Sequence, residues 1–363
     1  MEFALTDEQV MLQDTIVRTL DRVCPLDRVR AAAAANEAYA PDVWAALAEL
    51  GLAGLIIPEE HGGSGLTLLD AALAAEALGR SATPVPFAAT AVMAPLALMG
   101  SGSPAQQAHW LPRLASGEAI AGVAISEQAS GARDGAGVVS GGGRLTGKAL
   151  FVLDAGPAHL FIVADNVGGL HLVPADADGL TYTGLTSVDA TRSIGELSFT
   201  NTPAEALNAR DAAATLRRMI DAGRVVLAAD ILGAGQRMIE KAVAYAMERT
   251  QFGRVIGSFQ AVKHLCAEMA AKLEPCRSLI WYAAYAAAED TERASLMAAH
   301  AKAHTSEVGT FVARTATEVH GGMGFTDLMG LHYWFKRIGL DRQLLGGPER
   351  VRRDAAVLQG WAR

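Results

Sequence analysis

The spacing of hydrophobic residues changes twice along this 363-residue chain, and these changes constrain its fold more than any other feature. Over residues 1–118 apolar side chains recur three or four positions apart, as at Leu69 and Leu73, which predicts amphipathic helices. Residues 119–205 carry short apolar runs between Gly, Pro, Asn and Asp clusters, which predicts strands. Helical spacing returns in longer segments over residues 206–363. The chain is therefore predicted to be an α+β protein, mostly α, with three successive domains.

The middle domain is expected to be a small antiparallel β-domain. Its candidate strands are the apolar runs 121–125, 150–153, 160–163 and 170–173. Three consecutive glycines between Ser140 and Arg144 predict a hairpin turn, because glycine adopts the positive φ angles that tight turns require.

The C-terminal domain is expected to be a bundle of four long helices. One apolar stripe begins at Leu216, a second runs from Phe259 to Leu273, and a third helix covers residues 291–318. A fourth helix is predicted to begin near Pro348, where proline suits the first turn. Pro275 is expected to kink the second helix, because its ring removes one backbone hydrogen bond.

Composition excludes several classes of protein. The chain has 31 Lys and Arg against 39 Asp and Glu, a net charge of −8, so binding to nucleic acid or anionic lipid is not expected. The longest apolar window, 87–99, is shorter than the ~18–20 residues that a membrane span requires. Three scattered cysteines suit neither a disulfide framework nor a zinc site. With no signal peptide visible, we expect a cytoplasmic protein.

The segment between the first two long helices, residues 249–260, is the sharpest functional signal. The guanidinium of Arg249 can bind phosphate oxygens through two parallel hydrogen bonds. Phe252 offers an apolar face to a nucleotide, and Gly253 lets the backbone approach a ligand. These residue types suit a dinucleotide pyrophosphate. The alternative is an ordinary loop between helices that contains one arginine.

A second signal is a turn containing Gly321, Gly322 and Gly324 at the end of the third long helix. Three glycines in four residues form a tight turn against which a phosphate-bearing ligand can lie. Alone, the turn would be more typical of a helix end without a ligand. His300, His304 and Glu307 have a spacing that could hold a metal, but a surface stripe is the simpler interpretation.

These motifs, together with segments 58–63 and 76–79, resemble signatures of the acyl-CoA dehydrogenase family over nearly the whole chain. The resemblance implies an N-terminal helical domain, a middle β-domain and a C-terminal four-helix bundle, usually in tetramers. It also implies FAD bound between two subunits, an acyl-CoA thioester as substrate, and an electron-transfer flavoprotein or similar acceptor.

The resemblance also implies roles for individual residues. Arg249, Phe252 and Gln260, with the glycine turn, would hold the adenosine diphosphate part of a neighbour's FAD. Ser126 would keep a hydroxyl beside the flavin, and Arg224 would contact the substrate. One departure is Glu318, which stands where the family usually has glutamine.

The catalytic base of the family is missing. Members carry this glutamate at one of two positions, and both are glycine here, Gly346 before the last helix and Gly223 on the long helix. General-base catalysis is typically worth 10²–10⁴-fold in rate, so the loss matters. Three weak substitutes remain, of which Glu349 is the best, ahead of Asp341 and Asp221; helix geometry predicts that Asp221 points away from Gly223.

The residues that face the flavin ring also depart from the family. Leu153 replaces a hydroxyl that bonds near N5, and Ala132 replaces a serine near the flavin phosphate. The resulting hypothesis is a non-catalytic subunit of a heteromeric acyl-CoA dehydrogenase, of a type that acts on bulky steroid-derived CoA thioesters. Alternatives are a self-sufficient homotetramer that uses Glu349, a flavin-free scaffolding subunit, and a flavin monooxygenase of the same fold.

Overall fold

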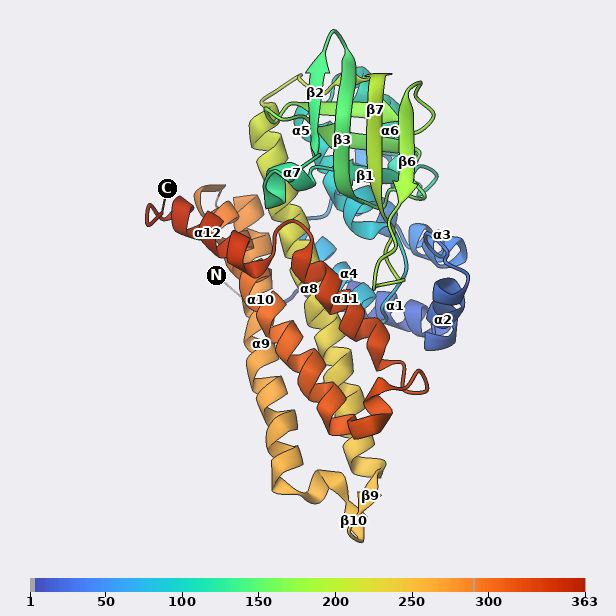
Figure 1. Cartoon of the computed structure of the whole chain (residues 1–363), viewed down its shortest axis with the longest axis vertical. Helices are drawn as coiled ribbons and strands as arrows, with labels where there is room; N and C mark the ends of the chain where they lie inside the picture. The colour runs from blue at the N-terminus through green and yellow to red at the C-terminus, as the bar shows by residue number, and fades with distance from the viewer. Residues whose placement is uncertain (1–3, 290, 363) are drawn as a thin grey trace.

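The structure, a computed structural model, describes residues 4–289 and 291–362. The β-sheet lies at one end of an elongated molecule, and the C-terminal bundle extends away from it (Figure 1). The N-terminal helices pack between the two. They are α1 (Asp7–Val23), α2 (Leu26–Ala34), α3 (Pro41–Glu49), α4 (Leu68–Arg80), a π-helix (Ala88–Met93), α5 (Ala94–Ser101) and α6 (Pro104–Ala115).

The long apolar window of the sequence is a core segment. Residues of the π-helix are all buried, and α5 continues from it with Pro95 in its first turn, where a missing N–H is tolerated. Within the described part of the chain, no helix has the length and apolarity needed to cross a membrane.

The middle domain is one sheet with the strand order β6-β7-β3-β1-β4-β5-β8, and β2 pairs with β3. The short helix α7 (Ser126–Ser130) follows β1. The predicted hairpin is confirmed, because Gly142 and Gly143 take φ angles of 58° and 72° between β2 and β3. The strands are β1 (Ala121–Ala124), β2 (Gly137–Gly141), β3 (Arg144–Leu153), β4 (Leu160–Ala164), β5 (Leu170–Pro174), β6 (Leu180–Gly184), β7 (Ile194–Pro203) and β8 (Glu205–Ala206).

The sheet is not wholly antiparallel, so the prediction of an antiparallel domain was wrong at one pairing. Strand β1 pairs with β4 in parallel, with Ala121 opposite Leu160. Strand β3 lies antiparallel along one edge of β1, and the chain then returns on the other edge as β4. Because β3 already runs opposite to β1, β4 has the same direction as β1.

The C-terminal domain contains α8 (Ala212–Glu248), α9 (Gln260–Glu289), α10 (Thr291–His320), α11 (Leu331–Gln343) and α12 (Pro348–Leu358). The helix predicted to begin near Pro348 is confirmed as α12, with proline in its first turn. The prediction missed α11, which packs on α8 and α10 as the fourth helix of the bundle, whereas α12 packs mainly on α10. The inward face of α11 combines Leu331, Trp334 and Ile338 with the buried charges of Arg337 and Asp341. These charges interrupt the apolar stripe and conceal the helix from a periodicity argument.

Candidate functional site

The first predicted motif forms an exposed hairpin at the end of the bundle farthest from the sheet (Figure 1). Strands β9 (Thr250–Gln251) and β10 (Arg254–Val255) flank a turn in which Phe252 and Gly253 take φ angles of 52° and 75°. The Phe252 side chain is 92% exposed. The Arg249 side chain is also exposed, and among the described residues its guanidinium has no hydrogen bond or ion pair. Both groups are therefore free to contact another molecule.

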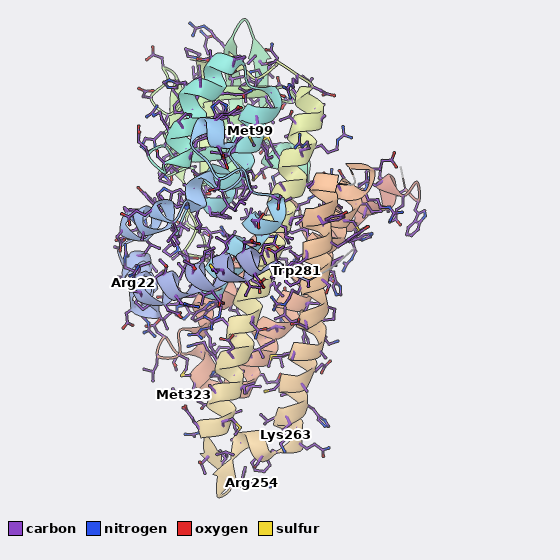
Figure 2. The ribbon with its side chains drawn as sticks, turned by 180° about the vertical axis from the view of Figure 1, so that it is seen from behind. Arg22, Met99, Arg254, Lys263, Trp281 and Met323 are labelled. Atoms are coloured by element: carbon purple, nitrogen blue, oxygen red, sulfur yellow. The ribbon has the colours of Figure 1, made fainter. Side chains whose placement is uncertain are left out.

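The glycine turn lies beside this hairpin. Tyr245, one turn before Arg249 on α8, stacks on His320 at the end of α10, with ring centroids 4.6 Å apart. Figure 2 shows Arg254, Lys263 and Met323 toward the same end of the molecule. The structure thus brings the two sequence motifs together.

The glycines of the turn differ in what surrounds them. A Cβ added at Gly321 or Gly322 would meet nothing within 4 Å, so the backbone there is open to a ligand. A Cβ at Gly324 would lie 2.6 Å from the carbonyl oxygen of Thr317, so that glycine is required by packing against α10. We define Arg249, Phe252, Gln260, Gly321 and Gly322 as the clasp.

In the region predicted to face a flavin ring, Leu153 and Ser126 are buried and contact neighbouring side chains. Leu153 is 5% exposed and lies in an apolar cluster, so it offers no hydrogen-bond donor. The Ser126 hydroxyl accepts a hydrogen bond from Nη1 of Arg133 at 3.2 Å. The same guanidinium lies 4.8 Å from the ring centroid of Phe151. This region fits a flavin ring poorly, whereas the clasp fits the phosphate end of a dinucleotide.

The clasp and the ring region of one chain are far apart. On α8, Arg224 lies next to the ring region, because its guanidinium donates to the carbonyl oxygen of Ala129 in α7. Arg249 directly follows the last residue of the same helix. The rise of about 1.5 Å per residue separates these two arginines by about 37 Å. The clasp and the ring region of one chain therefore cannot contact the same part of a bound cofactor.

Neither position of the expected base carries a carboxylate. Gly346 lies in the loop before α12, and Gly223 lies on α8 facing that loop. Glu349 is exposed, and hydrogen bonding by its own backbone N–H, together with Arg342 at 3.0 Å, lowers its pKa. Asp341 is fully buried and paired with Arg192 at 2.6 Å. The structure thus aims neither Glu349 nor Asp341 at the position of the missing base.

A cavity of about 470 Å³ lies beside α7, α8 and α12. Arg224, the predicted substrate contact, lines this cavity and forms an ion pair with Asp354 at 2.6 Å. Asp221 lines the cavity on a different face of α8 from Gly223, as helix geometry predicted, and burial raises its pKa. The other charged lining residues are Arg217, Arg350 and Arg353. With four arginines and two aspartates, the cavity suits an anionic ligand.

The histidine pair of α10 shows no sign of a metal site. His300 and His304 line a shallow groove, and Glu307 pairs with Arg352 of α12 instead of joining them. Across residues 4–289 and 291–362 there is no group of three His, Cys, Asp or Glu side chains that could hold a metal ion.

Sequence reasoning missed Lys302, a buried cation on α10. Its Nζ donates to the carbonyl oxygens of Arg342 at 2.9 Å and Gly346 at 3.3 Å, so it holds the loop before α12. Burial lowers its pKa to about 7. No sequence signal distinguishes it from a surface lysine, because only the folding of α11 over α10 covers it.

The depressed pKa of Lys302 predicts a pH dependence of stability. The unfolded chain binds more protons than the folded chain between about pH 7 and the ordinary lysine pKa of 10.5, so the free energy of unfolding rises with pH in that window. In Lys302→Met the rise in the free energy of unfolding is expected to be smaller, because residue 302 then binds no proton in either state. Urea unfolding at about pH 7 and about pH 10 measures it, with the exposed Lys336→Met as control. If the free energy of unfolding rises between the two pH values as much in Lys302→Met as in wild type, the prediction is contradicted.

Comparisons with known proteins identify the family. Residues 6–118 match the family model of the acyl-CoA dehydrogenase N-terminal domain, and residues 213–357 match that of the C-terminal domain. Acyl-CoA dehydrogenase IpdE2 of Mycolicibacterium smegmatis is 31% identical over 353 residues, covering 96% of this chain and 98% of the relative.

Two solved structures are also similar. One chain of the ChsE4-ChsE5 complex from Mycobacterium tuberculosis matches with a TM-score of 0.91 and 28% identity, covering 100% of this chain and 100% of that chain. A variant of the Tcur3481-Tcur3483 steroid ACAD covers 98% of each chain with a TM-score of 0.88 and 30% identity. The chain therefore belongs to the acyl-CoA dehydrogenase family, FAD-dependent oxidoreductases that act on the CH–CH bond of acyl-CoA thioesters.

Proposed function

We propose that this chain is the non-catalytic subunit of a heteromeric acyl-CoA dehydrogenase. In that complex it holds the adenosine diphosphate end of an FAD whose flavin ring is seated on a related subunit. One observation supports this assignment above the others: within the described residues Arg249 of the clasp has no hydrogen bond or ion pair, whereas the ring region lacks a base, buries Leu153 and pairs Ser126 with Arg133.

Each residue of the clasp has a task in this proposal. Bound FAD would supply the acceptor for a hydride from the β-carbon of the thioester. Arg249 binds the phosphates, and the face of Phe252 covers an apolar part of the nucleotide. Gly321 and Gly322 let the backbone approach the ligand, and Gln260 offers its amide from the first turn of α9. The base and the ring contacts come from the partner subunit.

The names of the similar structures support a class of substrate. One is a steroid ACAD with two named components, and the other is a two-protein complex. A bulky, ring-bearing CoA thioester is therefore the proposed substrate of the complex, with an electron-transfer flavoprotein or a similar protein as the electron acceptor.

Co-expression with a related acyl-CoA dehydrogenase that retains its glutamate tests the proposal. Arg249→Ala in the resulting complex is expected to weaken FAD binding about 10- to 100-fold, because a charge-assisted hydrogen bond contributes about 1.5–3 kcal/mol. Flavin absorbance after dilution and gel filtration measures the loss. The exposed Arg18→Ala on α1 is the matched control and should retain FAD.

Two outcomes would favour the alternatives. A yellow homotetramer of this chain alone that reduces its FAD with an acyl-CoA would overturn the proposal, and loss of single-turnover reduction in Glu349→Gln would then identify the displaced base. Complexes without flavin absorbance, in which Arg249→Ala changes nothing, would indicate a scaffolding subunit.

A further inference from the structure

The loop between α11 and α12 inserts Leu345 into a notch on α8. A Cβ added at Gly223 would lie 2.4 Å from Cδ1 of Leu345 and 2.9 Å from Sδ of Met93. Leu345 is 4% exposed and Met93 is fully buried. These two side chains therefore fill the space that any larger residue at position 223 would need.

Leu345 is held there in an unfavourable backbone conformation. Its φ angle is +56°, in the left-handed region that costs a non-glycine residue of this kind about 1–2 kcal/mol. Arg224 donates from Nε to the carbonyl oxygen of Leu345 at 3.1 Å, and Lys302 holds the next carbonyl, that of Gly346. A strained conformation persists only where surrounding contacts impose it. Two buried cations impose it here.

We propose that Leu345 determines which subunit of the complex admits the acyl chain. The inference rests on the proposed function. Positions 223 and 346 are the two places at which the family carries its base, and Leu345 lies between them, so its isobutyl group occupies the place of the reacting carbons. Arg224 connects the arginine-lined cavity to this loop, because it both lines the cavity and donates to the carbonyl oxygen of Leu345. The CoA part of a thioester can approach this subunit, but its acyl part has no room.

Binding of two probes to the purified heteromeric complex tests this inference. Butyryl-CoA and free CoA are titrated calorimetrically into wild type and into a complex carrying Leu345→Ala. In wild type this subunit should bind butyryl-CoA no more tightly than CoA. Removing the isobutyl group makes room for about three methylene groups, so Leu345→Ala should add one site that prefers butyryl-CoA by at least about tenfold.

Leu344→Ala is the matched control, because Leu344 is a neighbouring leucine that is 6% exposed and contributes none of the three atoms nearest to a Cβ at Gly223. It should lower the melting temperature as Leu345→Ala does, without adding a site. A wild-type complex that already binds butyryl-CoA on both subunits, or a Leu345→Ala complex without the added site, overturns the inference. If the isolated chain remains inactive in those cases, the proposed function stands.

A second variant keeps the test decisive if Leu345→Ala does not fold. Gly223→Ala would force Leu345 and Met93 out of the notch, so its melting temperature should fall although alanine favours helices. Gly339→Ala on α11, where an added Cβ meets nothing within 4 Å, should raise it. A rise in both variants would show that Leu345 does not fill the notch.

Discussion

Gly233→Ala is expected to destabilise the protein by about 3 kcal/mol or more. A Cβ at Gly233 would lie 1.8 Å from the carbonyl oxygen of Glu76 on α4 and 2.9 Å from the backbone nitrogen of Arg80. From the other side, a Cβ at Gly79 would lie 2.0 Å from the carbonyl oxygen of Asp230. The backbones of α4 and α8 thus touch, and no side-chain rotation can relieve the clash. Overpacking of a core typically costs 1–3 kcal/mol, and more where backbones must separate.

The sign of the effect makes this prediction specific. In an isolated helix the same substitution would stabilise by about 0.8–1.0 kcal/mol. Gly339 is exposed, so Gly339→Ala should show this intrinsic gain. The urea concentration at the unfolding midpoint should therefore rise in Gly339→Ala and fall in Gly233→Ala. A higher unfolding midpoint for Gly233→Ala would mean that α4 and α8 do not cross as closely as the structure has them.

Arg337→Leu is expected to destabilise by about 3–5 kcal/mol. The Arg337 side chain is 2% exposed and donates to both carboxylate oxygens of Asp230 at 2.7 Å. It also donates to the Thr83 carbonyl oxygen and to the Thr191 hydroxyl, so it joins α11, α8 and the two neighbouring domains. Removing it leaves buried acceptors without this donor and leaves Asp230 with Arg192 as its remaining cationic partner. Thermal unfolding followed by circular dichroism measures the loss.

A double variant separates the charge from the packing. Arg337→Leu with Asp230→Leu removes both members of the pair, and it should cost less than the sum of the single variants, because the uncompensated buried charge disappears. Arg18→Leu, whose side chain is 80% exposed beside Asp14, should change stability by less than about 1 kcal/mol. Additive single and double variants would contradict a coupled buried network.

The helices and strands that sequence reasoning located share a clear physical signature. Runs of apolar residues bounded by turn residues predicted four strands, and the three glycines after Ser140 predicted the hairpin, because both patterns are local. Helix α11 was missed because its buried face carries Arg337 and Asp341, whose burial depends on partners on α8 and in the loop before β7. A periodicity argument counts such residues as exposed.

The chain's own residues determined its family and its order of helical and β segments, and they predict the chemistry of the clasp, since these depend on residue types at fixed spacing. They also revealed the two glycines at the positions of the base. Tertiary structure alone decided that the clasp motifs meet through Tyr245 and His320, that Lys302 is buried, and that Leu345 fills the notch at Gly223. These facts depend on contacts between segments far apart in the chain, and such contacts leave no local pattern.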